Sequence, residues 1–151
     1  MVVDDEEDIR KVISIYLKKV GYETSTAENG QDALNKFKKG HFDVILSDLT
    51  MPEMDGLELL EKIREFDKEV IFLMITGHPS IKTAVDAIKK GAYDYIEKPL
   101  QLDEMKIKIE RAFESKYLKE QLRTSRALAW ALIVSIPLWL ILGLMLAKLL
   151  R

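Results

Sequence analysis

Residues 70–76 read Val-Ile-Phe-Leu-Met-Ile-Thr, six apolar side chains followed by a hydroxyl. A strand that is apolar on both faces is typical of a parallel sheet with helices on both sides. Residues 42–47 form a second apolar stretch, residues 2–3 form a short apolar stub, and residues 23–27 and 93–97 also read as strands. We therefore expect five strands at these positions.

Amphipathic helices are expected between these strands. From residue 7 to residue 20, apolar residues recur three and four positions apart, the spacing that places them on one helix face. Similar spacing predicts helices over residues 31–39 and 80–90, around residues 57–63, and from about residue 102. Strict alternation of strands and helices predicts an α/β fold built on a doubly wound, five-stranded parallel sheet.

The composition divides the sequence near residue 126. All 25 acidic residues and 21 of the 23 Lys and Arg residues precede that point, so the first part carries a net charge of −4 and the remainder +2. The first part shows no basic stripe, which argues against direct nucleic-acid binding. The absence of cysteine excludes disulfides and thiolate metal sites.

Polar residues stand at the ends of four predicted strands. Asp4 and Asp5 follow the first strand and Asp48 follows the third, whereas Thr76 ends the fourth and Lys98 follows the fifth. In doubly wound sheets the functional crevice lies beyond the carboxyl ends of the strands. Carboxylates placed together repel one another, and a hard divalent cation offsets that repulsion. We expect this acidic cluster to form a cradle for Mg²⁺, with Asp4 and Asp5 holding the ion.

This set of residues suits phosphoryl transfer to a carboxylate. Asp48 stands alone at the end of its strand and is the best candidate nucleophile. A carboxylate beside Mg²⁺ can attack phosphorus and become an acyl phosphate, while an ammonium group balances the charge of the transferring oxygens. Lys98 would pair with the phosphoryl group, and the hydroxyl of Thr76 would donate a hydrogen bond to it.

Four segments carry a resemblance to a known family: VVDDEEDIR (2–10), DLTMPEMDG (48–56), TGH (76–78) and YIEKP (95–99). In this order and spacing they resemble the receiver domain of two-component response regulators, especially receivers of the nitrogen-regulatory class. The resemblance covers residues 1 to about 120. It implies a flavodoxin-like sheet with strand order 2-1-3-4-5.

The resemblance also implies a role for individual residues. Asp48 would be the phosphoacceptor and a metal ligand beside Asp4 and Asp5, and the backbone carbonyl of Thr50 would complete the protein ligands. Thr76 and Tyr95 would form the conformational switch, and the peptide between Lys98 and Pro99 would be cis. The family implies phosphotransfer from a phosphohistidine of a sensor histidine kinase, and slow self-catalysed hydrolysis, without the chain being a conventional enzyme.

Each assignment has a simpler alternative. Asp4 and Asp5 could complement the dipole of the first helix, which is the only role expected for Glu6, Glu7 and Asp8. Asp48 could be a cap, and Tyr95 could be plain sheet packing. The whole domain could be a phosphorylation-independent scaffold. An aspartyl phosphatase of the haloacid-dehalogenase type is discounted, because such enzymes place a second acid where Thr50 stands.

Residues 127–147 read ALAWALIVSIPLWLILGLMLA, 21 residues without a charge. A helix of this length spans about 31 Å, the thickness of the hydrocarbon core of a bilayer. The segment is therefore expected to be a single transmembrane helix, with the receiver on the cytoplasmic side of the inner membrane. The alternative is a hydrophobic helix buried in a soluble dimer. Small residues at a four-residue spacing, interrupted only at Trp139, suggest self-association into a homodimer: Ala127, Ala131, Ser135, Gly143 and Ala147.

The expected organisation is a receiver domain over residues 1–120, a helical linker that continues its last helix over 121–126, the membrane segment 127–147 and a basic end, 148–151. Receivers usually have several residues before the VVDD segment, so a true start upstream of Met1 is an alternative. The sensor kinase is the expected partner, and the downstream protein is not identified by the sequence.

Overall fold

The computed structural model describes residues 1–77 and 80–149. It places all five expected strands in one parallel sheet of order β2-β1-β3-β4-β5. The strands are β1 (Val2–Val3), β2 (Thr26–Ala27), β3 (Val44–Asp48), β4 (Ile71–Thr76) and β5 (Asp94–Glu97). The predicted fold class and strand order are therefore confirmed.

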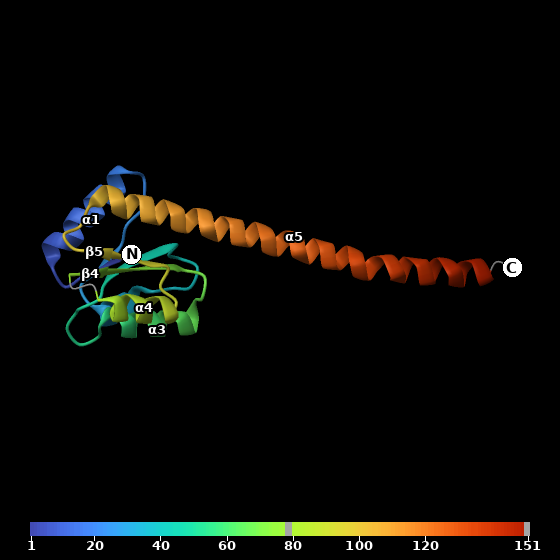
Figure 1. The fold of residues 1–151 in the computed structure, drawn as a ribbon, viewed down its shortest axis with the longest axis horizontal. Coiled ribbons are helices and arrows are strands. Elements are labelled where there is room, and N and C mark those ends of the chain that lie inside the picture. Colours follow the sequence, from blue (N-terminus) through green and yellow to red (C-terminus); the bar gives the residue numbers. More distant parts are fainter. Residues whose placement is uncertain (78–79, 150–151) are drawn as a thin grey trace. The chain divides into compact units, whose positions relative to one another are not determined.

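Helices connect the strands, as the apolar spacing predicts. They are α1 (Glu7–Lys19), α2 (Gly30–Lys36), α3 (Gly56–Phe66), α4 (Ile81–Lys89) and α5 (Leu102–Leu149). Helices α3 and α4 cover one face of the sheet, and α1 and the beginning of α5 cover the other (Figure 1). Both faces of β4 are thereby covered, which explains why all six of its residues are buried.

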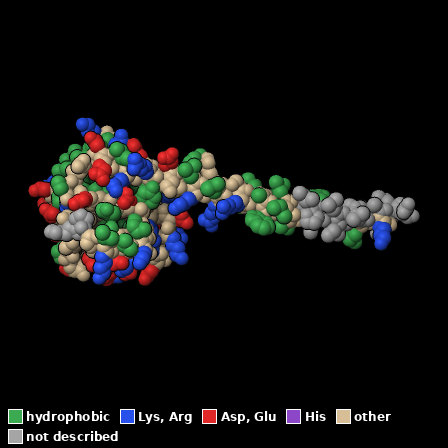
Figure 2. All heavy atoms as spheres, in the orientation of Figure 1, with side chains coloured by type: hydrophobic (Ala, Val, Ile, Leu, Met, Phe, Trp, Pro, Cys, Tyr) green, Lys and Arg blue, Asp and Glu red, His purple; other side chains and the backbone are tan. Residues whose placement is uncertain are grey.

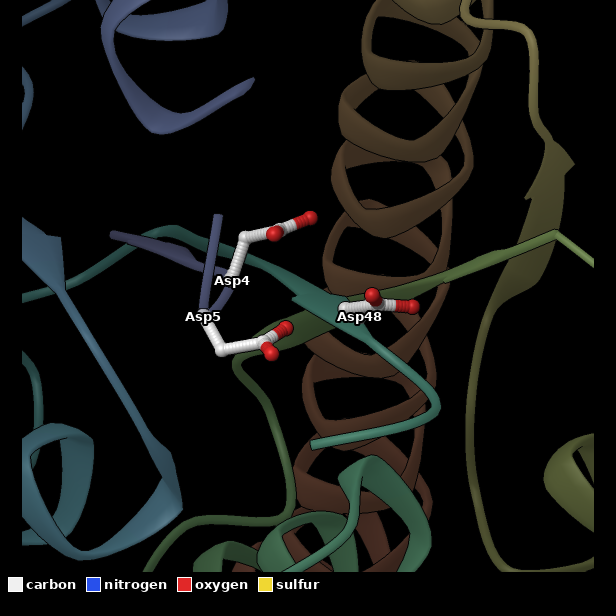
Figure 3. Close-up of side chains that lie close together, drawn as sticks. All are labelled: Asp4, Asp5 and Asp48. Carbon is white, nitrogen blue, oxygen red and sulfur yellow. The ribbon is translucent and has the colours of Figure 1, made fainter. Parts of the chain in front are cut away.

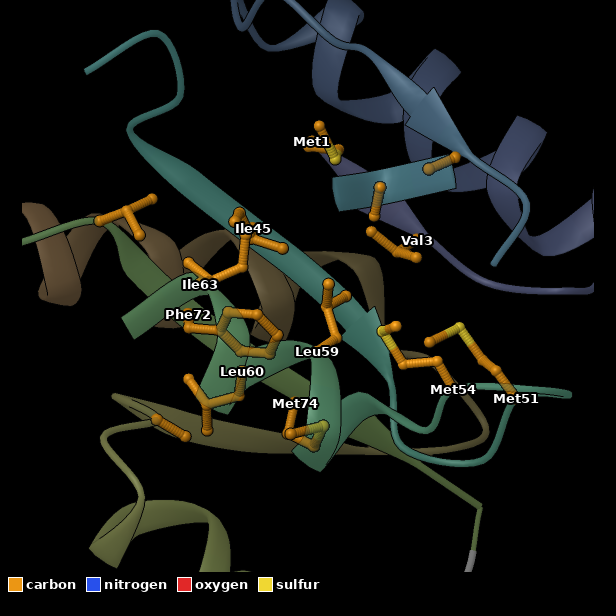
Figure 4. Close-up of a cluster of buried hydrophobic side chains, with 14 of the residues drawn as sticks. Met1, Val3, Ile45, Met51, Met54, Leu59, Leu60, Ile63, Phe72 and Met74 are labelled. Atoms are coloured by element: carbon orange, nitrogen blue, oxygen red, sulfur yellow. The ribbon is translucent and has the colours of Figure 1, made fainter. Parts of the chain in front are cut away.

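The main hydrophobic core lies between the sheet and the α3 side. Phe72 and Met74 of β4 alternate toward this face and pack with Leu59, Leu60 and Ile63 of α3 (Figure 4). The intervening β4 residues are equally buried against the opposite layer. The alternation of side chains along a strand thus supplies both cores from one apolar sequence.

Strand β2 begins three residues later than predicted and helix α2 ends three residues earlier, both for reasons of tertiary structure. Strand β2 contains only two residues because its single neighbour, β1, is also two residues long. Helix α2 ends at Lys36 because Phe37 adopts an extended backbone conformation. This conformation lets Phe37 pack against the core and stack on Phe42, with ring centroids 6.2 Å apart.

The chain divides into two compact units, Met1–Ala112 and Phe113–Arg151. On the face of the first unit that Figure 2 shows, acidic and basic side chains are intermixed. The predicted limits at residues 120 and 126 are not tested by this division and stay predictions. Residues 150–151 of the predicted basic end lie outside the described residues.

The predicted transmembrane helix is not supported by the structure. Within the part of the chain that is described, no helix is both long enough and apolar enough to cross a membrane. The surroundings of several residues of the segment 127–147 are not described by the structure. Gly143 and Ala147 of the predicted small-residue face are among them.

Candidate functional site

The sheet topology brings the three predicted aspartates together. Strands β1 and β3 are parallel neighbours with Val3 opposite Ser47, so the residues that follow lie at the same edge of the sheet. One carboxylate oxygen from each of Asp4, Asp5 and Asp48 lies within 4.8 Å of the others (Figure 3). The predicted convergence of these side chains is therefore observed.

The environments of the three carboxylates differ. Asp4 is fully buried and Asp48 is 5% exposed, whereas Asp5 is exposed. Oδ1 of Asp4 accepts a hydrogen bond from the backbone N–H of Glu6 at 2.8 Å. Oδ2 of Asp4 accepts no hydrogen bond from the residues that the structure describes. Burial raises the pKa of Asp4, and the Asp48 charge adds to this, although the hydrogen bond from Glu6 and the Lys98 ammonium partly oppose it.

Lys98 supplies the positive charge of the site. It follows β5, and its Nζ lies 2.8 Å from Oδ2 of Asp48 and 3.1 Å from Oδ2 of Asp4. Burial by itself lowers the pKa of Lys98, but the hydrogen bond to Asp48 and the charges of both aspartates outweigh burial, so the pKa is raised. The group is therefore an ammonium ion at neutral pH. The peptide from Lys98 to Pro99 is cis, as the resemblance implies.

Glu6 does more than complement the helix dipole. It is the N-cap residue of α1, and Oε1 of its side chain lies 3.4 Å from Nζ of Lys98. No sequence pattern signals this contact, because Glu6 and Lys98 lie 92 positions apart. Glu7 and Asp8 lie in the first turn of α1, as expected.

The remaining predicted residues flank this cluster. The backbone N–H of Thr50 lies 3.4 Å from Oδ1 of Asp48, in the loop after β3. Thr76 is buried at the end of β4, and its backbone carbonyl accepts a hydrogen bond from the N–H of Lys98. Thr76 and the half-buried Tyr95 line one small cavity with residues of α4. Their predicted switch roles and the metal-ligand role of the Thr50 carbonyl are not tested by this placement.

Two further residues position the acidic side chains. A Cβ atom at Gly56 would overlap the backbone carbonyl of Asp48, so only glycine lets α3 begin this close to the end of β3. Arg10 donates a hydrogen bond from its guanidinium to the backbone carbonyl of Asp4 at 2.6 Å. The DG dipeptide at residues 55–56 is visible in the sequence, but the close approach at Gly56 is a tertiary feature that sequence patterns do not show.

The donor set fits a magnesium ion. The carboxylate oxygens of Asp4, Asp5 and Asp48 are hard ligands, and they come from two strand ends held in fixed register. The buried Oδ2 of Asp4 has the Lys98 ammonium 3.1 Å away as an ion-pair partner but accepts no hydrogen bond from the described residues, so it keeps a lone pair for a metal ion. Exposure of Asp5 leaves one side of the cluster open to water or to phosphate oxygens.

Comparison with curated proteins finds the same sequence pattern in response regulators. The chain is 37% identical over 123 residues to the regulatory protein AtoC of Escherichia coli strain K12. The aligned region covers 82% of this chain and 27% of that protein. It is 42% identical over 123 residues to a putative response regulator of the NtrX type from Rickettsia bellii, covering 80% of this chain and 26% of that protein. The chain thus spans about a quarter of the length of these relatives.

Solved structures agree on the fold. The crystal structure of NtrX from Brucella abortus matches with a TM-score of 0.77 and 39% identity, over 83% of this chain and 29% of that one. A response regulator receiver domain protein from Clostridium thermocellum matches with a TM-score of 0.73 and 31% identity, over 78% of this chain and 94% of that one. The response regulator receiver domain family matches residues 1–110. The chain therefore belongs to the response regulator receiver domain family.

Proposed function

We propose that Asp48 accepts a phosphoryl group from the phosphohistidine of a sensor histidine kinase. An oxygen of the Asp48 carboxylate attacks phosphorus, the bond between phosphorus and the imidazole nitrogen breaks, and the imidazole leaves with the electron pair. The observation that carries this proposal is the contact of 2.8 Å between Asp48 and Lys98 beside two further aspartates. This ammonium is placed to balance the charge of the transferring oxygens.

Asp4, Asp5 and Asp48, with the backbone carbonyl of Thr50, would hold the Mg²⁺ ion that this chemistry needs. Bound there, the ion neutralises the carboxylates and the transferring oxygens. The protein itself provides the other groups needed for phosphoryl transfer. Asp48 provides the acceptor oxygen and Lys98 provides a fixed positive charge. The buried side of the site excludes water. Asp4 and Asp48 are both at most 5% exposed, which strengthens these electrostatic interactions.

Thr76 and Tyr95 would report the phosphorylated state. Thr76 lies at the end of β4, in the strand next to the one that carries Asp48. Its hydroxyl would donate a hydrogen bond to the phosphoryl group, and the half-buried Tyr95 would change rotamer in the cavity that both residues line. The resulting surface change would be read by a downstream protein.

Phosphorylation is tested by incubating the full chain with acetyl phosphate and Mg²⁺. We expect one acid-stable, base-labile phosphoryl group per chain on the peptide that contains Asp48, and none when Mg²⁺ is chelated. Asp48→Asn should stay unlabelled, whereas Asp43→Asn, in the same segment but before β3, should be labelled like the wild type. An unlabelled wild type would favour the phosphorylation-independent scaffold instead.

Membrane attachment is a separate proposal that rests on the uncharged sequence 127–147. Such a segment would hold the receiver at the cytoplasmic face of the inner membrane. We expect the full chain to stay with membranes after alkaline extraction. Leu132 and Val134 are exposed in α5, and changing both to Lys should release the chain, because each central charge opposes insertion by about 2.5–3.5 kcal/mol. A wild-type chain that is released by the alkaline wash would contradict attachment.

Self-association through the small-residue face of the same segment is likewise a proposal. Crosslinking of the full chain in lipid vesicles should trap a dimer. Ala131→Leu places a bulky side chain on this face and should reduce the crosslinked fraction. Leu132→Ala, at a position outside the face, should not. A chain that stays monomeric in lipid at all protein densities would overturn the proposal.

A further inference from the structure

The ammonium group of Lys98 has three carboxylate neighbours. Nζ of Lys98 lies 2.8 Å from Asp48, 3.1 Å from Asp4 and 3.4 Å from Oε1 of Glu6. The side chains of Asp4 and Asp48 are 0% and 7% exposed, whereas that of Glu6 is 62% exposed. Glu6 is therefore the weakest and most accessible of the three partners.

The reach of Glu6 toward Lys98 is set by the turn between β1 and α1. Its backbone N–H donates a hydrogen bond to Oδ1 of Asp4, and Arg10 holds the backbone carbonyl of Asp4. The neighbouring Glu7 points elsewhere and forms an ion pair with Lys11 at 2.6 Å. Two adjacent acidic residues thus have different partners, and only Glu6 contacts the site.

A lysine ammonium has three N–H donors. In this structure one donor bonds Asp48 and one bonds Glu6, while Asp4 is a close ion-pair partner. A phosphoryl group on Asp48 needs donors from the same ammonium. The hydrogen bond to Glu6 is exposed and is the longest of these contacts. Its release therefore costs the least interaction energy.

We propose that Glu6 is a positioning residue that competes with the phosphoryl group for Lys98. This inference rests on the proposed function of Asp48 and adds a residue that tunes it. Glu6 holds the ammonium at the solvent side of the site in the unphosphorylated chain, so its removal favours both the formation and the retention of the phosphoryl contact. Because an exposed ion pair contributes little to stability, the fold should be unaffected by its loss.

Three variants test this role. Glu6→Gln removes the charge, and Glu6→Asp keeps the charge but shortens the side chain. Glu7→Gln is the matched control, since it removes the same charge one position away without a contact to Lys98. The rate of phosphorylation by acetyl phosphate with Mg²⁺ is measured together with the dissociation constant for beryllofluoride, a phosphoryl mimic, by calorimetry. The binding measurement does not depend on any chemical step.

We expect both Glu6 variants to be phosphorylated about twofold to fivefold faster and to bind beryllofluoride about twofold to fivefold tighter, the range that an exposed pair supplies. Glu7→Gln should match the wild type. If Glu6→Asp matches the wild type while both Gln variants change equally, the effect is one of net charge and the proposal is overturned. An unchanged Glu6→Gln also overturns it. A wild type that is never labelled overturns the proposed function itself, which separates the two failures.

Discussion

Lys98 is the residue on which the electrostatic balance of the site depends. Its ammonium neutralises Asp4 and Asp48, two carboxylates that burial would otherwise leave without compensation. Taking the positive partner away from a buried carboxylate costs more than the pair itself contributes, because the remaining charge stays desolvated. Loss of the Lys98 charge should therefore destabilise the fold as well as impair phosphoryl transfer.

Lys98→Met keeps an apolar stem and removes the charge. We expect the free energy of unfolding to fall by about 1–3 kcal/mol, the cost of leaving buried charged acceptors unpaired. Urea denaturation in Mg²⁺-free buffer measures the change. The control is Lys90→Met, where the ion pair with Glu61 is exposed and the change should stay within about 0.5 kcal/mol. Equal effects of the two substitutions would show that Lys98 has no special role.

Asp4 shows a conflict between stability and function. Its pKa is raised by burial, so the ionised carboxylate opposes folding at neutral pH. Stability should increase as the pH falls through the folded-state pKa of Asp4, because the folded state then binds the additional proton. We expect Asp4→Asn to raise the free energy of unfolding at pH 7 in Mg²⁺-free buffer, because the amide has no charge to desolvate, and to weaken Mg²⁺ binding. A variant less stable than the wild type at every pH would contradict this reasoning.

At the scale of elements, the beginning of α3 is fixed by a close approach to β3. A Cβ atom at Gly56 would overlap the Asp48 carbonyl and lie 2.8 Å from Sδ of Met74. Gly56→Ala should therefore lower stability by about 1–3 kcal/mol, the usual effect of overpacking. At Gly77 the nearest atom of the described residues to an added Cβ would be Cδ of Lys98, at 3.9 Å, so Gly77→Ala is the control. Thermal denaturation compares the two.

The loop between α3 and β4 is organised by a buried carboxylate. Asp67 is 6% exposed, and its side chain accepts hydrogen bonds from the backbone N–H groups of Gly40, Glu69 and Val70. Burial alone raises the pKa of Asp67, but these three hydrogen bonds outweigh burial and lower it. The carboxylate therefore stabilises the fold above its unfolded pKa of about 3.9, and this contribution is lost as the pH falls through the lower folded-state value.

Asp67→Ala removes the three hydrogen bonds that the Asp67 carboxylate accepts. We expect the free energy of unfolding at pH 7 to fall by about 1–3 kcal/mol, because the buried N–H of Val70 and two partly buried N–H groups are left unpaired. The pH dependence of chemical denaturation should show the difference from the wild type shrinking below about pH 4. Asp86→Ala, at a half-buried position of α4, is the control. A difference that is constant down to pH 2 would exclude the ionised carboxylate as its cause.

At the scale of the whole molecule, the spacing of apolar residues predicted the helices and strands, because the buried faces of each element carry apolar side chains. The run Ile71–Thr76 is apolar on both faces since helices cover both sides, and α1 and α3 carry the expected apolar stripes. The ends of β2 and α2 could not be predicted in this way. The two-residue length of β1 limits β2, and the packing of Phe37 ends α2, so both limits depend on contacts between distant segments.

The candidate site was predictable to the extent that topology places strand ends together. Asp4, Asp5, Asp48 and Lys98 meet because parallel neighbouring strands end at one edge of the sheet. The contact of Glu6 with Lys98 and the close approach at Gly56 depend on the geometry of turns. The uncharged segment 127–147 suggested a membrane helix from composition alone, and the described residues do not support it.

Asp4, Asp5 and Asp48 are expected to form one divalent-cation site beside Lys98. Titration of the full chain with Mg²⁺ in a calorimeter measures binding at this site. We expect one Mg²⁺ per chain, with binding at least tenfold weaker in Asp5→Asn and unchanged in the control Asp8→Asn. Absence of Mg²⁺ binding, or equal binding by Asp5→Asn and the wild type, would contradict the claim.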